Sequence, residues 1–163
     1  MTGSRGYMLD TTEFNAVAKG YVDISAYAGK RLFATHVQLD ELNNARPEEK
    51  RARLLAAFDE IAPEKLLTES GVWGIVSRWG EFKWSAGDGV FKRMLSRLEE
   101  LDGEKRYPNQ HRDILIAETA IKNGLTLVSD DRRLRKVTEE FGGETLKPPR
   151  SQQVVEPRQL QRP

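Results

Sequence analysis

The chain has 163 residues and no cysteine, and 38% of its residues are hydrophobic against 31% charged. This length suits one domain with its own core, and the lack of cysteine excludes disulfides and thiolate metal sites. No apolar run approaches the ~20 residues that cross a bilayer, and no secretory signal pattern opens the chain. We therefore expect a cytoplasmic protein that is not membrane-bound. The formal net charge of +1 gives no overall basic field, so nucleic-acid binding would depend on local patches.

The first half of the chain alternates strand-like and helical segments. Residues 6–9 form a short apolar strand that stops at Asp10, and apolar residues then recur at helical spacing up to Gly20. The elements expected next are a strand at 31–37, a short helix at 38–45, an amphipathic helix at 48–61 and a further helix that opens at Pro63 and runs to about 72.

The second half continues the alternation after a segment that is hard to assign. We interpret residues 72–89 as a broken helix and loop. Its residues Trp73, Trp79 and Trp84 could stack on bases, although tryptophan more often packs in a core or an oligomer interface. The elements expected after it are a helix at 90–103, a helix at 113–123 ended by Gly124, a strand at 125–128, a helix at about 134–141 and a strand at 144–146.

This order of elements predicts an α/β fold. Alternating strands and helices favour a central parallel sheet with right-handed crossovers. Residues 1–146 are expected to form one domain. Residues 147–163 are rich in Pro, Gln and Arg, which predicts a flexible tail.

Acidic residues stand close to the ends of the predicted strands. Asp10, Asp130 and Asp131 directly follow strands, Glu41 lies on the helix after the second strand, and Asp113 opens a later helix. Because the carboxyl ends of parallel strands share one rim, we expect these acids to converge. Carboxylates within about 4 to 6 Å repel one another unless a cation compensates. A hard divalent cation with its bound water would suit phosphodiester hydrolysis.

Each acid also has a simpler interpretation when it is taken alone. Asp10, Asp113 and Asp131 suit helix N-caps or turns, and Glu41 suits a solvated helix face.

Taken together, four segments resemble the PIN-domain family, including the toxin ribonucleases of bacterial toxin-antitoxin pairs. The matching segments are YMLDTT at 7–12, LDEL at 39–42, DILIAETA at 113–120 and LTLVSDD at 125–131. The resemblance implies a three-layer α/β/α fold in which a central parallel sheet of four or five strands is flanked by helices.

The resemblance also implies the residues of a site. The catalytic and metal-binding acids would be Asp10, Glu41, Asp113 and Asp131, with Mg²⁺ or Mn²⁺ as the cofactor. Asp130 stands where the family more often has Asn, so Asp130 and Asp131 are both candidate metal ligands, and we favour Asp131.

Other residues could assist these acids. Ser129 would support Asp131. Thr11 and Thr12 could orient Asp10 or a metal-bound water, but capping of the first helix is the better interpretation. Basic residues near the last two motifs could bind the nucleic-acid backbone or form a solvated helix face; these are Arg112, Arg132 and Arg133, with Arg135 and Lys136 beside them.

The implied function is that of a metal-dependent endoribonuclease, with RNA as substrate, a small antitoxin protein as partner and a homodimer as the assembly. The alternatives are a non-catalytic PIN-like scaffold that binds RNA or protein, and a DNA-directed structure-specific nuclease, for which the chain is short. A dehalogenase-type phosphatase fits worse because Thr12 stands where a second Asp is needed. A receiver domain fits worse because the acidic pair comes late in the chain.

Overall fold

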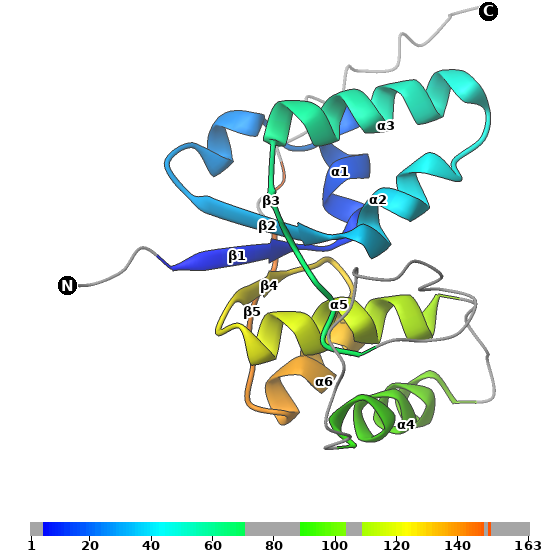
Figure 1. Ribbon diagram of the computed structural model, residues 1–163, viewed down its shortest axis with the longest axis vertical. Coiled ribbons are helices and arrows are strands. Elements are labelled where there is room, and N and C mark those ends of the chain that lie inside the picture. Colours follow the sequence, from blue (N-terminus) through cyan, green and yellow to red (C-terminus); the bar gives the residue numbers. More distant parts are fainter. Residues whose placement is uncertain (1–4, 71–88, 104–108, 149, 151–163) are drawn as a thin grey trace, which may run out of the picture.

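A five-stranded parallel sheet separates two layers of helices (Figure 1). The computed structural model describes residues 5–70, 89–103, 109–148 and 150. The strands follow the order β3-β2-β1-β4-β5 across the sheet. They are β1 (Gly6–Leu9), β2 (Arg31–Thr35), β3 (Glu64–Leu66), β4 (Thr126–Val128) and β5 (Glu144–Leu146).

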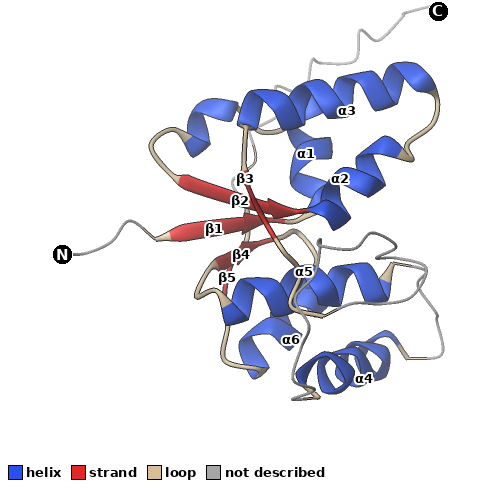
Figure 2. Ribbon diagram, in the orientation of Figure 1, coloured by secondary structure: helices blue, strands red, loops and turns tan. Residues whose placement is uncertain are grey.

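The two faces of the sheet are covered by different halves of the chain (Figure 2). One face carries α1 (Thr11–Ala18), α2 (His36–Asn43) and α3 (Glu48–Ile61), and a short 3₁₀ helix at Ile24–Tyr27 leads into β2. The other face carries α4 (Val90–Asp102), α5 (Gln110–Lys122) and α6 (Arg132–Glu140). This is the three-layer α/β/α arrangement that the sequence predicted.

Alternate residues of the central strands fill two separate cores. Met8 and Leu127 pack with α4, α5 and α6, whereas their neighbours Leu9 and Val128 pack with α1, α2 and α3. All four side chains are buried. The short central strands are therefore apolar at successive positions, as is typical of a parallel sheet covered on both faces.

Most predicted elements are confirmed, with small shifts at their ends. The bounds of β1, α3 and β5 agree with the prediction, and Gly124 has a φ of 65° after α5, as expected of a left-handed residue at that position. The predicted helix at 38–45 begins earlier, at His36, because the hydroxyl of Thr35 accepts a hydrogen bond from the backbone N–H of Val37. The helix predicted from 113 begins at Gln110.

The prediction of a helix that opens at Pro63 is wrong, because residues 64–66 form strand β3. Ala62 ends α3 in the left-handed region with a φ of 49°, and Pro63 follows it. The chain then pairs in parallel with β2, with Phe33 opposite Glu64. This pairing of residues distant in sequence outweighs the local helical pattern.

The topology creates a switch point between β1 and β4. The chain leaves β1 toward β2 on one side and returns to β4 on the other, and in open parallel sheets ligands bind beyond the strand ends at such a point. Within the described segments, no helix is long and apolar enough to cross a bilayer. Trp73, Trp79 and Trp84, and residues 149 and 151–163 of the predicted tail, lie outside the described residues.

Candidate active site

Asp10 lies at the switch point, directly after β1. Its backbone N–H donates to the carbonyl of Val128 in β4 (3.0 Å), which fixes the residue between the two central strands. Its Oδ1 accepts from the backbone N–H of Thr11 (2.8 Å) and its Oδ2 from the hydroxyl of Ser129 (2.7 Å). The residue is only 3% exposed, and this burial raises the pKa of its carboxyl group.

Asp131 is joined to Asp10 through Ser129. The Ser129 hydroxyl that donates to Asp10 also accepts from the backbone N–H of Asp131 (3.1 Å). The Oδ1 of Asp131 accepts from the backbone N–H groups of Arg133 (2.9 Å) and Leu134 (3.2 Å), so this residue is the N-cap of α6. The two acids therefore lie at the starts of α1 and α6, where the positive ends of the helix dipoles favour negative charge.

Asp113 in the first turn of α5 lies within reach of the other acids. Burial raises its pKa to about 9, with further contributions from the charges of Asp10, Glu41, Asp131 and Asp102. Carboxylates that act on one another in this way are neighbours in space. Asp113 also lines one cleft with Asp131, which is itself linked to Asp10 through Ser129.

Glu41 of α2 faces the same cluster. Burial, followed by the charge of Asp10, raises its pKa to about 7. Its Oε1 is buried and has no hydrogen-bond partner among the described residues. The hydroxyl of Thr11 is close enough to lower this pKa, but Oε1 still has no well-formed hydrogen bond to a described residue, so the oxygen favours a proton or a cation.

Asp130 makes a different contact from Asp131. Its carboxylate is ion-paired with Arg150, and Arg150 also pairs with the fully buried Glu13 of α1 (3.0 Å). Glu13 in turn accepts a hydrogen bond from the hydroxyl of Tyr27 (2.6 Å). Of the two candidate ligands in the Asp130-Asp131 pair, Asp131 is the one that is linked to Asp10 through Ser129 and whose charge acts on Asp113.

The interpretation of Thr11 and Thr12 as helix caps is wrong, because Asp10 itself is the N-cap of α1. The Oγ1 of Thr11 is buried, forms no well-formed hydrogen bond in the described part of the chain, and lies close enough to the carboxylate of Glu41 to lower its pKa. The hydroxyl of Thr12 lies 3.4 Å from Oδ2 of Asp10. The simpler interpretations of Asp10 and Asp131 as N-caps are confirmed, so both acids combine this role with their place in the cluster.

The sequence prediction missed Asp102, the last residue of α4. Its carboxylate accepts from the amide of Gln110 (2.6 Å) and from the guanidinium of Arg133. An acid in the last turn of a helix opposes the helix dipole, and this is the signal in the sequence that could have marked the residue. Asp102 helps to line a cleft of about 190 Å³, together with Leu98, Asn109, Gln110, Asp113, Asp131 and Arg133.

The predicted basic residues lie in different positions around the acids. Arg112 donates to the side chain of Asn109 (3.1 Å), and its charge partly offsets the effects that raise the pKa of Glu41. Arg133 lines the cleft, and Arg132 is exposed. Arg135 instead donates to the backbone carbonyl of Ser129 (2.7 Å), which places it among the contacts that hold the loop after β4.

The fit of the acids to a divalent cation rests on their chemistry. Among the described residues, no group of three or more His, Asp or Glu side chains is arranged as a ready metal site. The donor set is nevertheless of the kind that Mg²⁺ prefers, because it consists of carboxylate oxygens, among them those of Asp113 and Glu41, whose pKa values are raised. A cation would relieve their mutual repulsion, so the residues present fit such an ion.

Comparisons with known proteins identify the fold. No family model and no curated protein matches the sequence. Among solved structures, a chain of VapBC2 from Rickettsia felis, bound to a DNA fragment from their promoter, matches with a TM-score of 0.50 and 18% identity, covering 86% of this chain and 96% of that one. The chain has a PIN-like fold. A further match is FitAcB from Neisseria gonorrhoeae, with a TM-score of 0.45 and 12% identity, covering 86% of this chain and 96% of that one. Another is VapBC-5, a member of the VapBC family of toxin-antitoxin systems from Mycobacterium tuberculosis, with a TM-score of 0.44 and 19% identity, covering 88% of this chain and 97% of that one.

The PIN-like fold confirms the resemblance drawn from the four sequence segments at the level of architecture. At these identities the likeness extends to the fold alone. Within this PIN-like sheet, Asp10 follows the central strand, and Asp131 comes two residues after Ser129 at the end of the neighbouring strand.

Proposed function

We propose that this chain is a metal-dependent nuclease that hydrolyses RNA phosphodiester bonds at Asp10, Glu41, Asp113 and Asp131. The observation that carries the proposal is the convergence of these acids at the switch point of the sheet. It is supported by the link between Asp10 and Asp131 through Ser129 and by the cleft that Asp113 shares with Asp131, and the raised pKa values of Asp113 and Glu41 agree with it. A fold gains nothing in stability from buried carboxylates that repel one another, so their presence is best explained by a ligand of opposite charge.

The four acids have different roles, which follow from their surroundings. Asp10 and Asp131 are held in place by Ser129 and by backbone N–H groups, so they are the fixed members of the set. Glu41 and Asp113 are the members that hold protons near neutral pH, and they would release them to bind a cation. When bound, Mg²⁺ or Mn²⁺ would acidify a water and neutralise charge on the phosphate.

The finer assignment is the toxin of a toxin-antitoxin pair, with a small antitoxin as partner and a homodimer as the assembly. It is supported by the fold shared with a chain of VapBC2. An RNA substrate is supported by the resemblance of the four sequence segments to the toxin ribonucleases of the PIN-domain family. The cytoplasmic location remains a prediction.

The test is cleavage of labelled single-stranded RNA and DNA by the full chain with Mg²⁺ or Mn²⁺, with EDTA as the metal-free control. Asp10→Asn and Asp113→Asn are each expected to lower the cleavage rate roughly 100-fold or more, as when a charge-stabilising group is removed from an active site. Glu41→Gln should act in the same direction. Asp40→Asn is the matched control, because it removes the neighbouring acid on the same helix and should leave the rate within about twofold of wild type.

Two results would count against this proposal. Cleavage that persists in EDTA or in all three variants of the cluster would place the activity elsewhere or in a contaminant. A folded wild type that binds Mn²⁺ but cuts neither RNA nor DNA would favour the scaffold interpretation.

A further inference from the structure

An ion pair between a buried carboxylate and an exposed guanidinium joins α4 to α6 beside the acidic cluster. The side chain of Asp102, at the end of α4, is only 6% exposed and pairs with Arg133 in the first turn of α6, whose side chain is 45% exposed. The other oxygen of Asp102 accepts from the amide of Gln110 (2.6 Å). Asp102 and Arg133 line the same cleft as Asp113 and Asp131.

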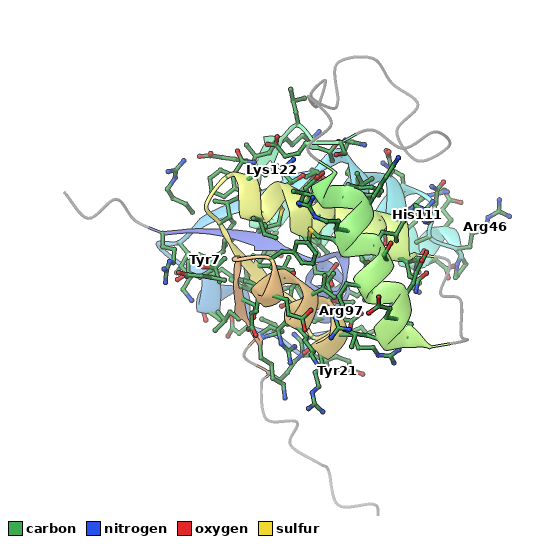
Figure 3. All side chains as sticks on the ribbon, turned by 90° about the horizontal axis from the view of Figure 1, so that it is seen from below. Tyr7, Tyr21, Arg46, Arg97, His111 and Lys122 are labelled. Carbon is green, nitrogen blue, oxygen red and sulfur yellow. The ribbon has the colours of Figure 1, made fainter. Side chains whose placement is uncertain are left out.

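Both ends of Arg133 are held in place. Its backbone N–H donates to Asp131 (2.9 Å), and its guanidinium donates to Asp102. The two helices that carry this pair are joined again further along, where Arg97 of α4 lies against α6 (Figure 3) and donates to both carboxylate oxygens of Glu140 (2.8 and 3.1 Å). The position of the Arg133 guanidinium at the cleft is therefore fixed from α4 and from α6.

Asp102 is an unfavourable choice if only the fold is considered. It places a negative charge at the C-terminal end of α4, where the helix dipole disfavours it. It also adds to the repulsion that acts on Asp113. Of its two side-chain partners, Gln110 and Arg133, only the arginine carries a charge that offsets that of Asp102, so the arrangement is best explained by the placing of that guanidinium.

We propose that Asp102 is a positioning residue that holds Arg133 at the cleft to bind a phosphate of the RNA backbone. This inference rests on the proposed nuclease function and selects one arginine from the predicted basic residues. A guanidinium binds phosphate through paired N–H donors, and here it lies on the wall that includes two of the cation-binding acids. Arg132, the preceding residue on the same helix, is exposed and forms no ion pair with a described acid.

The test is the affinity of the full chain for a labelled single-stranded RNA, measured by fluorescence anisotropy in EDTA over a series of salt concentrations. EDTA keeps the RNA intact, so binding is measured without cleavage. Arg133→Ala is expected to weaken binding about tenfold and to reduce the slope of log K against log salt by ~0.7, as for one lost phosphate contact on a single strand. Arg53→Ala is the control, because this exposed arginine lies on α3 and does not line the cleft, and it should change the affinity by less than about twofold.

The direction of the change in Asp102→Asn decides the role of that residue. Removal of a negative charge near RNA should tighten binding if Asp102 merely repels phosphates. If Asp102 positions Arg133, the same substitution weakens binding, by about threefold, and the double variant Asp102→Asn/Arg133→Ala binds no worse than Arg133→Ala alone. Arg133→Lys, which keeps the charge and loses the planar fork, should fall between wild type and Arg133→Ala.

The inference is overturned if thermally stable Asp102→Asn binds RNA as tightly as wild type or tighter. It is also overturned if Arg133→Ala weakens binding no more than Arg53→Ala, or if wild type binds no RNA at low salt. Cleavage with Mn²⁺ is measured in parallel. Cleavage by wild type combined with tighter binding by Asp102→Asn would refute the positioning role alone. The predicted binding pattern without any cleavage would refute the nuclease alone.

Discussion

Of Asp113 and Glu41, Asp113 is the acid whose pKa is raised more by burial and by repulsion from neighbouring carboxylates. Its carboxyl group lies among those of Asp10, Glu41, Asp131 and Asp102, and burial together with these charges raises its pKa to about 9. A carboxyl group in an unfolded chain loses its proton near pH 4. Between these two values the folded state keeps a proton that the unfolded state has lost, so the free energy of unfolding of the metal-free protein should fall as pH rises through this window.

Asp113→Asn should therefore stabilise the metal-free protein, and increasingly so from about pH 4 to about pH 9. The asparagine has no proton to lose and adds no charge to the cluster. The melting temperature in EDTA should rise by roughly 2–4 °C for each kcal/mol gained, with little difference from wild type at pH 4. Thermal melts of both proteins at pH 4, 6, 8 and 9 measure this. If the variant is no more stable than wild type at pH 8, then ionisation of Asp113 does not destabilise the metal-free fold, and this prediction is wrong.

Residues of the site were predictable where their position follows from the strands. Asp10 and Asp131 each stand at or just beyond the end of an apolar strand, and parallel strands bring such positions to one rim. Asp102 could not be placed in the same way, because its contacts with Gln110 and Arg133 depend on how α4 packs against α5 and α6. The same is true of Arg150, which is distant in sequence from its partners Glu13 and Asp130.

At the scale of elements, prediction succeeded where the pattern is local. The amphipathic helix α3 was predicted with its observed bounds, whereas β3 was taken for a helix. A three-residue edge strand has almost no pattern of its own and is defined by its pairing with β2. Local spacing contains no information about such a partner.

The segment that follows β5 is joined to α1 by an ion pair. Pro148 is buried, and Arg150 pairs with Glu13, whose side chain is fully buried, and with Asp130. The part of the predicted tail that the structure describes is thus in contact with the domain.

Arg150→Met should destabilise the fold because it leaves Glu13 buried without its cation. Loss of one partner of a buried pair costs about 3 kcal/mol or more, and urea denaturation would measure this cost. Adding Glu13→Gln to Arg150→Met should recover part of the loss. The matched control is Arg5→Met, which breaks the exposed pair with Glu144 and should cost about 1 kcal/mol or less. Equal losses in the two single variants would contradict a structural role for Arg150.

At the scale of the whole molecule, the sheet order explains why acids from distant segments meet. The chain moves outward from β1 in both directions, so α1 and α6 begin side by side at the switch point, and α2 and α5 bring Glu41 and Asp113 to the same place. The assembly of four acids from four elements is a property of the topology. The central claim is that this assembly binds a divalent cation.

The most direct test of that claim is calorimetric titration of Mn²⁺ into the metal-free protein at pH 7, repeated in buffers of different ionisation enthalpy to count the protons released. Cation binding requires deprotonated ligands, and the pKa values of Asp113 (about 9) and Glu41 (about 7) predict the release of roughly one proton or more. Asp113→Asn should bind more weakly and release fewer protons. Absence of Mn²⁺ binding would contradict the assignment of the four acids as a cation site. So would binding that releases no protons and that has the same affinity in Asp113→Asn.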